Sequence, residues 1–200
     1  MRTASLFITL LFLTFSTAPS FAALPMRPYS GIGVVRIAPA DLTRNLTLYD
    51  EPGLLRSGTL SQPAISALTS WLFGHGPDQY LLVVARKGDW LQVECDDGGG
   101  EAWWQQPPHR SGYSPWEQFL KGKTITFLRN APTKLQTTHP RPNAGVGDPL
   151  TASAPMKVIL VQNDWCYVLF GTTQAGWIRW RDDDGRLLIG LVQPDSAQSR

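Results

Sequence analysis

Two cysteines and three histidines are the residues of this 200-residue chain that could support nucleophilic catalysis. A cysteine nucleophile needs a base within hydrogen-bond reach and an activated thiolate. His75, His109 and His139 all lie in Gly- and Pro-rich loop sequence, and neither Cys95 nor Cys166 begins a helix, where a thiolate would be stabilised. A Gly-x-Ser-x-Gly elbow and a phosphate loop are also absent from the sequence. We therefore predict no catalytic residue and expect that the protein is not an enzyme.

The acidic run Asp182-Asp183-Asp184-Gly185 is the best candidate for cation binding, because clustered carboxylates bind hard cations. The run lacks the alternating Asp spacing of a calcium loop, and Trp180 stands where a ligand would be wanted. A solvated hairpin turn explains the run better, and the same holds for Asp96-Asp97. We expect no metal site and no cofactor.

An internal repeat becomes visible when the two Asp-Trp pairs are overlaid. The first copy runs from Leu81 to Val93 and closes at Ala102-Trp103-Trp104, and the second runs from Lys157 to Val168 and closes at Gly176-Trp177-Ile178. Each copy reads as an apolar strand, a tight turn, an alternating strand, a second turn and a short third strand. The pattern predicts two three-stranded antiparallel meanders.

Two short helices are predicted outside the meanders. An insertion near 62–73 has Ser61 as a cap and Gly74 as a stop, with apolar residues on one face. In the segment that joins the two halves, Ser114-Pro115-Trp116-Glu117 reads as a capping box, and the helix should run to about Lys121.

Strand parity separates core from surface, because successive side chains of a strand point to opposite faces. Leu91, Val93 and Cys95 share the apolar face of their strand, so Trp90 should point outward. The same count leaves an outer aromatic pair on adjacent strands of each copy, Trp90 with Trp103 and Trp165 with Trp177. The candidate ligand-binding residues are therefore Trp90, Trp103, Trp165, Tyr167 and Trp177. Two interpretations stay open, since these aromatics could line a groove for an extended ligand or only stabilise strand pairs and packing surfaces.

The two cysteines would normally suggest a disulfide in an exported protein. Parity points Cys95 and Cys166 into the cores of different repeats, and disulfide geometry does not bridge such a gap. We favour two free thiols, with a bridge as the alternative.

The order of these elements resembles the bacterial Src-homology-3-like domain, a small extracytoplasmic barrel that usually occurs in tandem. The resemblance rests on Leu46, Leu48, Pro52, Gly88–Trp90, Val93 and Ala102–Trp104 in the first copy, and on Leu135, Pro142, Asn163–Trp165, Val168 and Gly176–Ile178 in the second. It implies a mainly β chain of two tandem small Src-homology-3-like β-barrels, with short helices in an insertion and in the linker. It also implies binding to cell-wall peptides or to envelope proteins more often than catalysis.

Residues 1–22 read as a signal peptide, with Arg2 before an apolar stretch that is too short to span a bilayer. The expected domains are a first barrel over 23–105, a linker over 106–123, a second barrel over 124–193 and a frayed tail over 194–200. The mature chain should be exported, periplasmic or extracellular, without stable membrane insertion. Eighteen basic against 16 acidic residues, with no basic run, argue against nucleic-acid binding.

Two functions are compatible with these features. The leading hypothesis is a non-catalytic exported binding module that recognises a cell-envelope ligand, either a peptidoglycan peptide or an extended protein segment. The alternative is a structural or accessory subunit of an envelope protein assembly.

Overall fold

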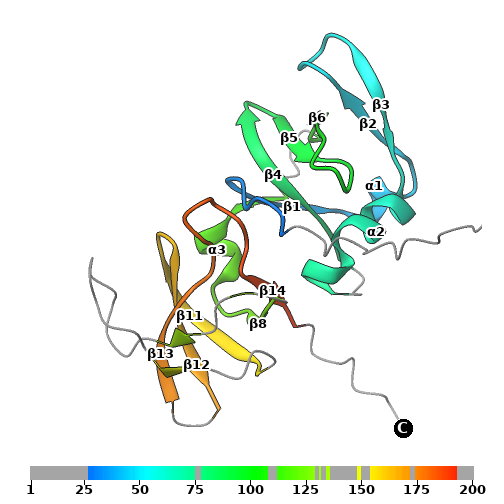
Figure 1. Cartoon of the computed structure of the whole chain (residues 1–200). Coiled ribbons are helices and arrows are strands. Elements are labelled where there is room, and N and C mark those ends of the chain that lie inside the picture. The colour runs from blue at the N-terminus through cyan, green and yellow to red at the C-terminus, as the bar shows by residue number, and fades with distance from the viewer. Residues whose placement is uncertain are drawn as a thin grey trace, which may run out of the picture.

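A computed structural model of the chain describes residues 27–74, 78–107, 112–128, 131, 134–135, 148–149, 154–171 and 174–192. In this part the chain is mainly β, with two antiparallel sheets, a two-stranded ladder and three helices (Figure 1). The predicted mainly β class is therefore confirmed. The predictions for the signal peptide at 1–22, for the three histidines and for the tail over 194–200 lie outside the described residues.

The first sheet has seven strands in the order β3-β2-β6-β5-β4-β1-β7. The strands are β1 (Gly33–Ile37), β2 (Leu46–Tyr49), β3 (Arg56–Leu60), β4 (Gln79–Lys87), β5 (Trp90–Glu94), β6 (Glu101–Gln105) and β7 (Tyr113–Pro115). The second sheet has the order β13-β12-β11-β8-β14. Its strands are β8 (Thr124–Phe127), β11 (Met156–Gln162), β12 (Trp165–Phe170), β13 (Gln174–Arg179) and β14 (Ile189–Leu191).

The two predicted meanders are confirmed as β4-β5-β6 and β11-β12-β13. The two meanders also share an irregularity in strand register. The register of β4 against β5 shifts between Val83 and Ala85, and the register of β11 against β12 shifts between Val158 and Leu160. These positions are equivalent when Trp90 is overlaid on Trp165. A bulge at the same place in both sheets shows that the repeat is structural and not only a similarity of composition.

The turns of the two meanders also correspond. In each meander the first hairpin turn contains one residue in the left-handed region, which Gly and Asn tolerate best. This residue is Gly88, at φ 61°, in the first copy and Asn163, at φ 52°, in the second. After the third strand, a backbone amide donates back to the turn Asp carbonyl in each copy: Gln106 to Asp89 at 2.9 Å and Trp180 to Asp164 at 3.0 Å.

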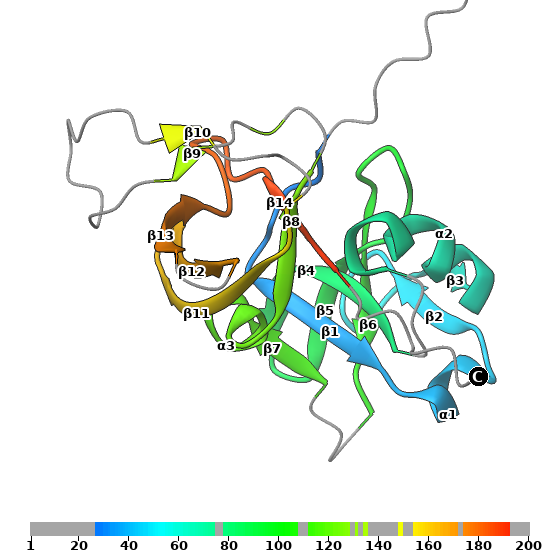
Figure 2. The ribbon, with the colours of Figure 1, turned by 90° about the horizontal axis from the view of Figure 1, so that it is seen from below.

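The strands that flank the meanders occur in the same order in both halves. β1 pairs with β4 and β7 pairs with β1, while β8 pairs with β11 and β14 pairs with β8. The short hairpin of β9 (Lys134–Leu135) and β10 (Asp148–Pro149) takes the place of β2 and β3, and β9 lies beside β13 as β2 lies beside β6 (Figure 2). Among the described residues neither sheet closes into a barrel, since β3, β7, β13 and β14 remain edge strands.

Three helices complete the described chain: α1 (Pro39–Leu42), α2 (Gln62–Phe73) and α3 (Trp116–Leu120). α2 begins and ends as the sequence predicts, with the Ser61 hydroxyl accepting from the Ala64 amide and Gly74 at φ 78° after its last residue. α3 is also present, but the predicted capping box is wrong. Ser114 belongs to β7 and Pro115 holds the N-cap position without a side-chain hydrogen bond, because the chain is still extended where the helix begins.

One hydrophobic core lies inside the first sheet, and a second core is shared between the halves. The first core gathers the inward residues of β1 to β6 with Ile65 of α2. The second core combines Leu72 and Leu82 of the first half with the inward face of the second sheet. At this seam the Trp116 and Trp180 rings lie 5.4 Å apart, and the Trp116 indole nitrogen donates to the Ser30 carbonyl at 2.6 Å.

None of the helices in the described residues is long and apolar enough to cross a bilayer.

Candidate functional site

The parity prediction for the core is confirmed on both middle strands. Leu91 and Val93 are fully buried in β5, and Cys166 and Val168 are fully buried in β12. Cys95 packs against the first core, as predicted, but it is only half-buried. It lies beyond the last residue of β5, at the start of the turn, and its thiol donates to the Gly100 carbonyl at 3.3 Å.

The aromatic residues of the first sheet point outward, but they pair differently from the prediction. Trp90 lies opposite Gln105 and Trp103 lies opposite Gln92, so the two indoles are diagonal neighbours. The direct ring contact of Trp90 is with Tyr49 of β2, edge to face at 5.1 Å between centroids. Tyr49 in turn lies opposite Trp103. Sequence reasoning missed Tyr49 because β2 joins the meander through a pairing that is distant along the chain.

The predicted aromatics of the second sheet also lie on its outer face, again in a diagonal arrangement. Tyr167 lies directly opposite Trp177, with ring centroids 5.3 Å apart. Trp165 lies opposite Arg179, whose guanidinium is 5.6 Å from the Trp165 ring centroid. A cation over an indole face is a favourable contact. The outer face therefore carries a continuous aromatic and cationic surface, which is formed by Trp165, Tyr167, Trp177 and Arg179.

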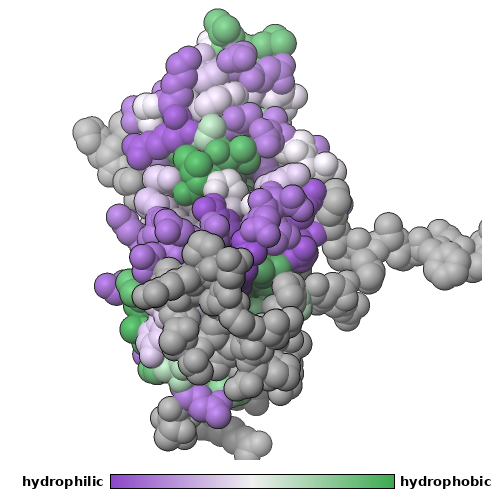
Figure 3. All heavy atoms as spheres, turned by 60° about the vertical axis from the view of Figure 1, so that its left-hand side comes forward, coloured by the Kyte–Doolittle hydropathy of each residue, from purple (hydrophilic) through white to green (hydrophobic). Residues whose placement is uncertain are grey.

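The outer face of the second sheet is more apolar than the equivalent face of the first. Leu160, opposite Tyr167, is 46% exposed, and Leu169 is 44% exposed. The same sites in the first sheet hold Ala85 and Glu94. We call the surface formed by Leu160, Trp165, Tyr167, Leu169 and Trp177 the apolar outer face. Other apolar residues are exposed at the turn between β2 and β3, the hairpin at the top of Figure 3.

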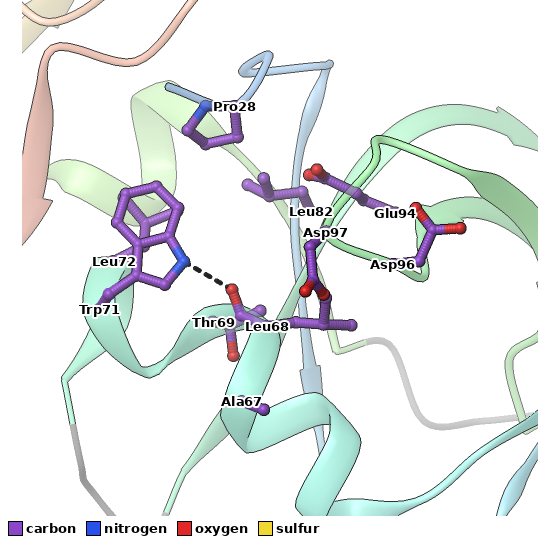
Figure 4. A pocket seen from close by; sticks show the side chains of 10 residues that line it. All are labelled: Pro28, Ala67, Leu68, Thr69, Trp71, Leu72, Leu82, Glu94, Asp96 and Asp97. Carbon is purple, nitrogen blue, oxygen red and sulfur yellow. Dashed lines mark hydrogen bonds between the residues drawn. The ribbon is translucent and has the colours of Figure 1, made fainter. Parts of the chain in front are cut away.

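A cavity that the sequence analysis did not predict lies between α2 and the end of β5. It has a volume of about 380 Å³, and its lining includes Leu68, Trp71 and Leu72 of α2, Leu82 of β4, and Glu94 (Figure 4). The Trp71 ring stands on one side, and the Glu94 and Asp97 side chains come from the other. We call this cavity the α2 pocket.

The carboxylates at the α2 pocket differ in their surroundings. Burial, together with the nearby Asp96 and Glu101 carboxylates, raises the pKa of Glu94 from its ordinary 4.5 to about 7. Asp96 is occupied by its own turn, where its Oδ1 accepts from the Gly98 amide at 2.9 Å and from the Gly100 amide at 2.7 Å. A pocket that holds a carboxyl group with a strongly raised pKa is a candidate binding site.

The remaining reactive groups have structural surroundings. Burial raises the pKa of both thiols, and neither cysteine is in a disulfide. The Asp182 carboxylate accepts from Arg27 at 2.8 Å and from the Arg186 amide at 2.8 Å, as expected for a turn residue. Within the described residues, no group of three His, Cys, Asp or Glu side chains is placed to hold a metal ion.

No protein-family model matches the chain, and no significant match was found among curated proteins or among solved structures.

Proposed function

We propose that this protein is a non-catalytic, exported binding module that holds a cell-envelope ligand, a peptidoglycan peptide or an extended protein segment, on its apolar outer face. The observation that carries the proposal is the contrast between the repeats. Tyr167 and Leu169 stand where the first sheet has Gln92 and Glu94, at equivalent positions of the same strand. The first sheet forms with polar residues there, so the strand does not require the apolar pair. Contiguous exposed apolar residues are typical of binding surfaces.

The same proposal assigns each half to the Src-homology-3-like fold. The repeated order of a flanking strand, a hairpin, a three-stranded meander and a last strand beside the first supports it. Aromatic-lined surfaces of small β domains hold extended ligands through stacking and apolar contact. Export rests on the pattern of residues 1–22.

The first sheet provides the substitutions that test this function. Tyr167→Gln and Leu169→Glu install the residues that the first copy carries at the same sites, so the sheet should still form. We expect the double variant to lose retention on purified sacculi or on immobilised envelope proteins, with a thermal midpoint within a few degrees of wild type. Gln92→Ala, on the equivalent strand of the first sheet, is the control and should be retained. Undiminished retention of the folded double variant would refute the role of this face.

A structural or accessory subunit is the alternative, and the exposed turn between β2 and β3 favours it. Leu54 and Leu55 there are 78% and 66% exposed, which suits a contact that is permanently covered by another protein. Such a subunit should ignore purified sacculi, should co-purify with an envelope protein, and should lose this partner when both leucines are replaced by Ser.

A further inference from the structure

The α2 pocket exists because the first half carries a helix, α2, that has no counterpart among the described residues of the second half. α2 occupies the connection from β3 to β4, whereas only residues 150–155 connect β10 to β11. One face of α2 packs into the cores through Ile65 and Leu72, and the neighbouring face borders the cavity with Leu68 and Trp71. A volume of about 380 Å³ is in the range of small-ligand sites.

The apolar wall of the pocket includes an exposed indole. Trp71 is 49% exposed, and its indole nitrogen donates to the Leu68 carbonyl of the same helix at 2.7 Å. This bond fixes the ring beside the opening, facing the side chains of Glu94 and Asp97 across the cavity (Figure 4). Leu68, Leu72 and Leu82 supply aliphatic surface between them.

The opposite wall is acidic and has no basic residue to balance it. Glu94, Asp96 and Asp97 line it, and no Lys, Arg or His is among the residues that surround the pocket in the described part of the chain. Asp96 is held by its turn, whereas the Glu94 carboxylate has no hydrogen bond or ion pair with any described residue. The equivalent residue of the second sheet is Leu169, so the strand itself does not require a carboxylate at this site.

We propose that the α2 pocket binds a cation on an apolar stem, of the kind that a lysine or arginine side chain presents. The cationic group would lie between the Glu94 carboxylate and the Trp71 ring, and the stem would lie along Leu68 and Leu82. Carboxylate pairing and contact with an indole face both favour a cation, and the aliphatic wall favours the stem. This site lies away from the apolar outer face, so the inference does not depend on the proposed function.

The carboxyl group of Glu94 makes the expected binding sensitive to pH. The ionisable groups that face it are Asp96, Asp97 and Glu101, while α2 carries no ionisable side chain. These acidic neighbours and burial keep Glu94 partly protonated near neutral pH. A bound cation favours the carboxylate, so affinity should fall by up to tenfold for each pH unit below about 7.

Three compounds of similar length separate the contribution of charge to affinity from the contribution of apolar burial. n-Pentylamine, pentan-1-ol and pentanoate are titrated at pH 8 into the full mature chain, and amide chemical shifts of the pocket residues are followed by NMR. Nα-acetyl-lysine amide tests the same cation in a peptide setting. Saturable binding of either amine, with the alcohol at least about tenfold weaker and pentanoate silent, supports the proposal. Failure of both amines to bind, or equal binding of amine and alcohol, overturns it.

Variants assign the effect to the pocket. Glu94→Gln should weaken amine binding by about tenfold and abolish its pH dependence, and Trp71→Ala should weaken it by a few fold. Glu51→Gln is the matched control, because that exposed carboxylate lies in the turn between β2 and β3, outside the pocket, and it should change affinity less than about twofold. Equal losses in Glu94→Gln and Glu51→Gln would show general electrostatic attraction and would overturn the assignment. The double variant Tyr167→Gln and Leu169→Glu should lose sacculus retention and should still bind the amines. The two proposals can therefore fail separately.

Discussion

Replacing Glu94 by Gln should stabilise the fold at alkaline pH and leave it unchanged in acid. The pKa of Glu94 is raised from 4.5 to about 7 by burial and by neighbouring carboxylates. The folded protein therefore binds this proton more tightly than the unfolded chain does. The contribution of protonated Glu94 to stability is fully present below about pH 4.5. It is lost as the pH rises to about 7. Gln carries no charge, so Glu94→Gln should not show this loss.

The size of the effect follows from the shift of the pKa. At about 1.4 kcal/mol for each pH unit, the full shift corresponds to an upper limit of about 3 kcal/mol. Glu94 is only half-buried, and solvent screens part of the repulsion. We therefore expect Glu94→Gln to raise the free energy of unfolding by about 1 to 2 kcal/mol at pH 8.

Urea denaturation of wild type and variant at pH 4, 6 and 8 measures the effect. The difference in free energy of unfolding should be near zero at pH 4 and should grow steadily to pH 8. Glu51→Gln, at an exposed residue of the turn between β2 and β3, provides a control that should show no such growth. A difference that is constant over the whole range would refute the electrostatic reasoning, because it would indicate a change in packing.

Four further outcomes test the packing of the fold. Gly31→Ala should destabilise the protein by at least about 2 kcal/mol in urea denaturation, because an added Cβ would lie 2.3 Å from the Val83 carbonyl oxygen at a φ of 57°. Ser61→Ala removes the cap of α2 and should cost about 1 kcal/mol, with Ser61→Gly less harmful. The Cys166 thiol, fully buried, should react with iodoacetamide only after denaturation, as mass spectrometry would show. Trp116→Ala should lower stability by about 3 to 5 kcal/mol while calorimetry still shows a single transition.

Local patterns of the sequence were sufficient for the elements that depend on neighbouring residues. The alternation around Leu91 and Val93 placed them inside and Trp90 outside, because strand parity requires no knowledge of distant contacts. The limits of α2 followed from Ser61 and Gly74, which satisfy the helix ends locally. The repeat was visible for the same reason.

Features that depend on distant pairings could not be predicted in this way. The sequence does not predict β1 as a strand, although it separates β4 from β7, since five residues without clear alternation carry little signal. Tyr49 reaches Trp90 only through the pairing of β2 with β6. The α2 pocket brings Trp71 next to Glu94, and nothing in either local pattern indicates that contact.

The seam at Trp116 and Trp180 ties the fates of the two repeats together. Leu72 and Leu82 complete a core whose other members belong to the second half. Cutting the chain between the halves would open that core to water, and each excised half would expose an apolar surface that is prone to aggregation. Substitutions are restricted in the same way, because a change of side-chain volume on one side of the seam requires a compensating change on the other. The two copies of the repeat should therefore unfold together as one cooperative unit.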